Sequence, residues 1–134
     1  MKRVYEMNIL VGIFLILHGL VHFWPITLSQ GWVEYQPDMG WTGQSWLLSG
    51  LMGSDLLKWL ATALFGLAAL AFITAGAGKL GDQVWARTWI LAASALSAVT
   101  LVLFWDGGTQ QLIEKGLIGV LIDMALLVWV LWSI

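Results

Sequence analysis

Residues 8–28 read NILVGIFLILHGLVHFWPITL, an apolar run that contains two histidines and one proline. About 20 apolar residues in a helix cross the hydrocarbon core of a bilayer, which is about 30 Å thick. The run is longer than the core of a signal peptide, roughly 7–15 residues, so we expect an uncleaved first membrane span. His18 and His22 are four residues apart within it and therefore share one helix face.

The rest of the chain repeats this apolar pattern. The protein has 134 residues, of which 60% are hydrophobic and 10% are charged, unlike a typical soluble domain. Apolar runs predict further spans over about 55–77, 84–105 and 111–134, after a first span over about 8–28. Pro25 predicts a kink or fraying near the outer end of the first span. The second span is expected to end at its glycines, Gly76, Gly78 and Gly81. We therefore expect an all-α, single-domain membrane four-helix bundle, with one long loop between its first two helices.

The composition of the chain and the motifs that it lacks argue against several functions. A net charge of −2 without a basic block argues against nucleic acid as a partner. The absence of cysteine excludes disulfides and thiolate metal sites within this chain. There is no Walker loop, dinucleotide fingerprint, nucleophile elbow or HExxH motif, which argues against hydrolases and ATP-driven pumps. No catalytic residue can be assigned.

The loop between residues 29 and 54 is rich in glycine and aromatic residues. The aromatic residues are Trp32, Tyr35, Trp41 and Trp46. They predict an aromatic belt at the membrane surface or, alternatively, a lid over the mouth of the bundle. Residues 44–52 could form a short helix lying in the interface, because their apolar side chains would gather on one side.

The basic residues predict an orientation. Four of them fall on one expected side: Lys2, Arg3, Lys79 and Arg87. Two fall on the other: Lys58 and Lys115. Because cytoplasmic loops carry the excess of Lys and Arg, both termini are expected inside and the long loop outside. We expect a multi-pass protein of a bacterial or archaeal inner (cytoplasmic) membrane.

Three titratable side chains lie deep in the expected spans: His18, His22 and Asp123. A charge at the bilayer centre costs about 2.5–3.5 kcal/mol on insertion scales, so such residues usually face the bundle interior. The first and fourth helices run in opposite directions, and His18 and Asp123 lie near their middles. The two side chains should share a depth, with His22 one turn outward, level with Gly119, which leaves room beside it.

These residues support several hypotheses. In a structural network, Asp123 accepts a hydrogen bond from His18, and His22 bonds a backbone carbonyl or a serine of the third helix. Small residues around 93–98 would let another helix approach there. A metal ion would find His18, His22 and Asp123 but no convincing fourth ligand, so no metal site is predicted.

Two hypotheses make the histidines functional. His22, or His18, could ligate a haem or chlorin or bond a quinone, with Trp24 as a wall of the cofactor site. Alternatively, His18, His22 and Asp123 could form a proton relay, because histidine titrates near neutral pH. The outward His22 is the better candidate for a ligand, and the deeper His18 for a structural bond.

A family resemblance adds a context for these residues. The glycine-apolar run from Gly12 into His18-Gly19, followed by a long loop and three more spans, resembles the DoxX-like group of small four-helix bacterial membrane proteins. Relatives with His-Gly-x-x-His and a Trp-Asp-x-Gly turn, here residues 105–108, are more similar still. Members of the group more commonly have lysine where His22 stands, so no site residue is carried over.

The resemblance implies an association with quinone-linked redox complexes. We therefore expect an accessory subunit of a larger respiratory or electron-transfer complex. Its partners would be membrane lipids and other membrane-protein subunits, or further copies of itself. The alternatives are a quinone- or haem/chlorin-binding component of an oxidoreductase, and an oligomeric protein for proton relay or transport.

Overall fold

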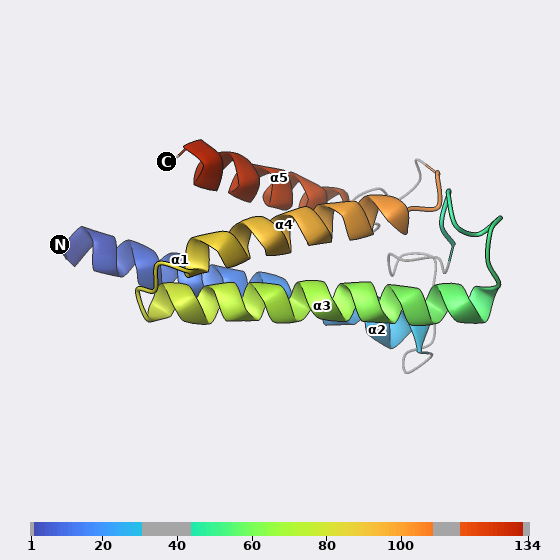
Figure 1. Ribbon diagram of the computed structural model, residues 1–134, viewed down its shortest axis with the longest axis horizontal. Helices are drawn as coiled ribbons and strands as arrows, with labels where there is room; N and C mark the ends of the chain where they lie inside the picture. The colour runs from blue at the N-terminus through green and yellow to red at the C-terminus, as the bar shows by residue number, and fades with distance from the viewer. Residues whose placement is uncertain (1, 31–43, 109–115, 133–134) are drawn as a thin grey trace.

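The computed structural model describes residues 2–30, 44–108 and 116–132 (Figure 1). Over these residues the structure is helical and contains no strand. The helices are α1 (Lys2–Val21), α2 (Phe23–Ser29), α3 (Ser54–Leu80), α4 (Ala86–Leu103) and α5 (Leu117–Trp132). Three stretches are long and apolar enough to cross a membrane: Lys2–Thr27, Ser54–Leu80 and Ala86–Leu103. The predicted all-helical architecture is confirmed over these residues, and its long apolar helices fit a membrane-spanning protein.

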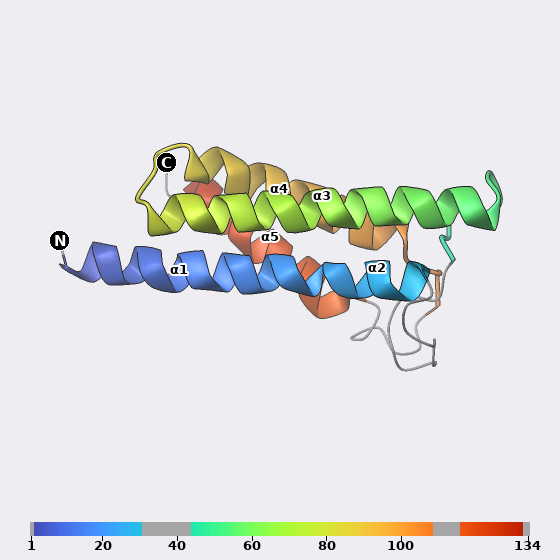
Figure 2. The same cartoon turned by 90° about the horizontal axis from the view of Figure 1, so that it is seen from below.

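The helices pack as a bundle in which α1, α3, α4 and α5 follow one another and α5 comes back beside α1. Figures 1 and 2 show α1 and α2 along α3, α3 beside the antiparallel α4, and α4 beside α5. Among the described helices, α5 packs its backbone on α4 alone, and α1 reaches α5 through side chains. Trp32, Tyr35 and Trp41 of the predicted outer loop lie outside the described residues, as does the predicted start of the fourth helix.

The first span is broken at His22. The helix begins at Lys2, earlier than the predicted start near Asn8, because no Gly or Pro interrupts residues 2–8. The sequence also predicted a kink or fraying near Pro25. Pro25 lacks the N–H that would bond the carbonyl of Val21, and its ring crowds that carbonyl. At the break, the backbone N–H of His22 donates to the carbonyl of Gly19 at 3.0 Å, three residues back, where a regular α-helix would bond four residues back. Figure 2 shows α2 continuing close to the axis of α1.

Glycines inside α3 bring two helices together. The sequence predicted that Gly76, Gly78 and Gly81 would end this helix, whereas α3 continues to Leu80 and only Gly81 caps it. A Cβ at Gly76 would lie 2.6 Å from the carbonyl oxygen of Gly12, and one at Gly78 would lie 2.7 Å from the ring of Trp85. These glycines are in the helix because they permit close approach, not because they terminate it.

Residues 44–53 tie the loop to the far end of α4. The structure has turns here instead of the predicted short helix. The Ser45 hydroxyl donates to the carbonyl of Leu103, and the Trp46 indole donates to the carbonyl of Val102 at 2.7 Å. These bonds satisfy carbonyls at the end of α4 that have no partner within the helix.

Candidate functional site

The buried face of α1 carries His18. Gly12, Leu15, His18 and Gly19 are buried at helical spacing. A Cβ at Gly19 would lie 2.9 Å from the carbonyl oxygen of Ala69, so the two glycines bring the α1 backbone directly onto α3. This close packing fixes the direction in which His18 leaves its helix.

Aromatic rings enclose the imidazole of His18. The Phe14 ring stacks on it with centroids 5.8 Å apart, and the Phe72 ring of α3 meets it edge-on at 4.7 Å. The side chain is therefore removed from the surroundings of the bundle except along the direction of its hydrogen bond.

That hydrogen bond goes to Asp123. His18 Nε2 lies 3.0 Å from Asp123 Oδ1, and the carboxyl group is fully buried. The structure thus brings together, from α1 and α5, the two residues that the sequence placed at one depth. Since these helices approach each other through side chains, the His18–Asp123 bond is a direct polar link between them.

His22 joins the same group from the helix break. Its Nδ1 lies 2.8 Å from the carbonyl oxygen of His18, and its Nε2 lies 2.6 Å from the hydroxyl of Ser97 on α4. The Ser97 hydroxyl in turn lies 2.5 Å from Asp123 Oδ2. We call these four residues, His18, His22, Ser97 and Asp123, the His–Ser–Asp network.

The bonding partners determine how many hydrogens the His–Ser–Asp network contains and which atoms can carry them. A carbonyl oxygen only accepts, so His22 Nδ1 carries a hydrogen and donates it to His18. The three remaining links need three hydrogens, of which the Ser97 hydroxyl supplies one. When His18 Nε2 donates to Asp123, the third hydrogen resides on Asp123 or on His22 Nε2.

Both arrangements carry no net charge. In the first, a neutral Asp123 donates to Ser97, and Ser97 donates to a neutral His22. In the second, an imidazolium at His22 donates to Ser97, which donates to the Asp123 carboxylate. The two differ only by a shift of hydrogens through the Ser97 hydroxyl. An uncharged network suits a lipid-embedded bundle, because an isolated charge there is costly.

The space that the sequence predicted beside His22 is not opposite Gly119. A Cβ at Gly119 would lie 3.0 Å from the Leu101 side chain. His22 instead faces Ser97 and the Phe72 ring, whose centroid is 5.3 Å away. Trp24 lies on α2 with its side chain 41% exposed. Ligation of a haem, chlorin or quinone by His22 would therefore require the bond to Ser97 to open.

The same applies to a metal ion. His18, His22 and Asp123 each offer one ligand atom, and these atoms lie within 4.8 Å of one another. Both ring nitrogens of His22 and both oxygens of Asp123 already have hydrogen-bond partners. A metal ion could bind these residues only in exchange for bonds of the network.

Ser97 is the member of the network that the sequence did not single out. The available signal was the small-residue pattern of the third span, in which Ala93, Ser94, Ser97 and Thr100 are all buried. That pattern shows which face of α4 packs inward. It does not show which serine meets the histidines: Ser94 Oγ, buried one turn away, has no partner among the described residues.

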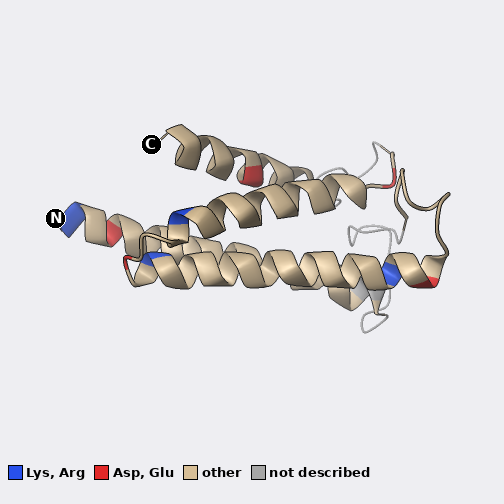
Figure 3. Ribbon diagram, in the orientation of Figure 1, with Lys and Arg blue, Asp and Glu red and all other residues tan. Residues whose placement is uncertain are grey.

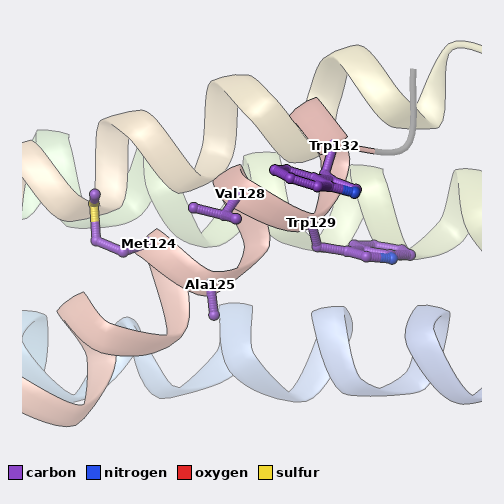
Figure 4. A pocket seen from close by; sticks show the side chains of 5 residues that line it. All are labelled: Met124, Ala125, Val128, Trp129 and Trp132. Atoms are coloured by element: carbon purple, nitrogen blue, oxygen red, sulfur yellow. The ribbon is translucent and has the colours of Figure 1, made fainter.

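Two apolar hollows lie outside the network. One is on α5 and is lined by Met124, Ala125, Val128, Trp129 and Trp132 (Figure 4). The other lies between α1 and α5, with Phe14 and Trp129 among its lining residues. Neither is lined by a titratable side chain.

No protein-family model, curated protein or solved structure matches this chain.

Proposed function

We propose that this small membrane protein is an accessory subunit of a larger membrane complex, with the His–Ser–Asp network as its internal structural lock. The supporting observation is that His22 and Asp123 have all of their side-chain polar atoms bonded within the network. Lipid supplies no hydrophobic drive between helices, so packing and interhelical hydrogen bonds must hold them. A satisfied network that joins α1, α4 and α5 favours one arrangement of the bundle.

The hollow on α5 is the surface that we assign to a partner. Figure 4 shows its side chains along one side of the helix, with the indoles of Trp129 and Trp132 close together. Among the described helices only α4 packs its backbone on α5, and large apolar side chains of α5 such as Val128 are exposed. A hollow between such side chains accepts the side-chain ridge of another helix.

The proposed setting is an inner membrane complex of respiration or electron transfer, in line with the DoxX-like resemblance. The basic residues support the orientation with both termini inside. Lys2, Lys79 and Arg87 gather at one end of the bundle, and Lys58 lies at the other (Figure 3).

Replacing either of two exposed alanines by phenylalanine tests the subunit role. Ala125 lines the hollow on α5, and Ala63 is exposed on α3. We expect the wild-type protein, extracted gently from its native membrane, to run on a native gel in a particle larger than the monomer. Ala125→Phe fills the hollow and should shift the protein to monomer size, whereas Ala63→Phe should not. A wild-type monomer in native extracts would refute the proposal.

The hydrogen count favours one second candidate, a proton relay. A shift through the Ser97 hydroxyl moves one positive charge between His22 and the carboxyl group of Asp123. In that case proton flux into liposomes containing the wild-type protein should fall to background in Ser97→Ala and in Asp123→Asn. Flux that both variants leave unchanged would exclude the relay.

A further inference from the structure

The second apolar hollow is a groove between α1 and α5. Met7, Leu10, Val11 and Phe14 line it from α1, and Leu126 and Trp129 line it from α5. It has a volume of about 320 Å³ and runs about 10 Å along α1, at 1.5 Å per residue. Its inner end is the Phe14 ring that stacks on His18. The lining suits a hydrocarbon chain and offers nothing to a polar ligand.

A lysine closes the other end of this groove. Lys79 Nζ lies 5.6 Å from the centroid of the Trp129 ring and 3.4 Å from the side-chain oxygen of Asn8. The ammonium group therefore lies between α5 and α1. Among the described residues, no carboxylate lies within ion-pair distance of it.

The end of the bundle around Lys79 is positive. The described basic residues there are Lys2, Arg3, Lys79 and Arg87. The carboxylates are Glu6 and Asp82, so four positive and two negative charges leave a net charge of +2. Asp82 accepts a hydrogen bond from the Asn8 amide at 2.8 Å, and Arg87 donates to the carbonyl of Val130 at 2.8 Å. The Lys79 ammonium thus remains available to an anion.

We infer that the groove binds one anionic phospholipid, with an acyl chain between α1 and α5 and the phosphate beside Lys79. Basic sites between membrane helices on the cytoplasmic side recognise lipid headgroups. The Trp129 indole lies at the junction, the depth at which tryptophans meet the headgroup region. This assignment does not depend on the proposed subunit role.

Native mass spectrometry of the full-length protein tests the assignment. The purified protein is exchanged into phosphatidylglycerol or into phosphatidylcholine with the same acyl chains. We expect about fivefold higher retention of phosphatidylglycerol, because Lys79 attracts its net negative headgroup, whereas the choline cation of phosphatidylcholine cancels the charge of the phosphate. Equal retention of the two lipids would overturn the proposal. So would displacement of phosphatidylglycerol by millimolar inorganic phosphate, since a free anion does not need the groove.

Substitutions separate the charge from the groove. Lys79→Gln should reduce the retention of phosphatidylglycerol to that of phosphatidylcholine. Lys58→Gln, at the opposite end of α3, should leave it unchanged. Leu10→Trp fills the groove, keeps the lysine and should lower retention of both lipids. Equal retention by the two lysine variants, or unaltered retention by Leu10→Trp, would contradict the site. If Lys79→Gln does not fold, the wild-type comparison and Leu10→Trp still decide.

Discussion

Asp123 is the residue that most requires explanation, because a fully buried carboxyl group in a membrane span is costly. Its two oxygens contact His18 and Ser97, and the hydrogen count permits an arrangement in which no member of the network is charged. The cost of burial is then offset by hydrogen bonds alone. A neutral amide could make the same two bonds, donating to Ser97 and accepting from His18.

Ser97 is the bridge, and its removal should be measurable. Ser97→Ala leaves His22 Nε2 and Asp123 Oδ2 buried without a partner, which should cost about 1–3 kcal/mol of stability. The matched control is Ser94→Ala, one turn away on α4. Its hydroxyl is buried without a partner among the described residues, so its loss should leave the melting temperature unchanged or higher. Both variants are compared with wild type by thermal unfolding in one detergent. Similar destabilisation by the two would contradict the bridge.

The glycines of α3 decide how the helices meet. A Cβ at Gly76 would lie 2.6 Å from the carbonyl oxygen of Gly12, whereas one at Gly66 would meet only the Ile26 side chain at 3.8 Å. Gly76→Ala should therefore force α1 away from α3 and destabilise the protein by about 1–3 kcal/mol. Gly66→Ala should be neutral or stabilising by up to about 1 kcal/mol, since alanine favours helix. Thermal unfolding distinguishes them, and a stable Gly76→Ala protein would disprove the close approach.

The sequence predicts where the helices lie, but it does not predict all of their ends. Apolar runs show where helices lie, and Pro25 shows where the first one is interrupted. Gly76 and Gly78 misled because glycine both ends helices and lets them approach, and only the neighbouring helix distinguishes the two roles. The interfacial helix over residues 44–52 was wrong because Ser45 and Trp46 bond the end of α4, a contact that local periodicity cannot contain.

At the scale of the whole molecule, the order in which the helices pack determines which residues can meet. The depths of His18 and Asp123 follow from the lengths and directions of their spans, so the sequence could predict that pair. The place of Ser97 could not be predicted, because periodicity gives the buried face of α4 without showing which helices that face contacts. The open groove between α1 and α5 likewise depends on the order of packing.

The orientation in the membrane can be tested with single cysteines, because the chain has none. Glu6 and Asp55 are exposed near opposite ends of the bundle. In intact cells, a membrane-impermeant maleimide should label Asp55→Cys and should label Glu6→Cys only after permeabilisation. Neither substitution removes a basic residue, so the charge bias is preserved. The reverse labelling pattern would show that the termini face outward.

The central claim is that hydrogen bonds of Asp123 lock the bundle, and the melting temperatures of two Asp123 variants in detergent test it most directly. Asp123→Asn keeps a donor for Ser97 and an acceptor for His18, and we predict that it melts close to wild type. Asp123→Leu fills similar space but leaves His18 Nε2 without a partner and Ser97 bonded to His22 alone. We predict a loss of about 1–2 kcal/mol and a lower melting temperature. Equal melting temperatures for Asp123→Leu and wild type would contradict the account.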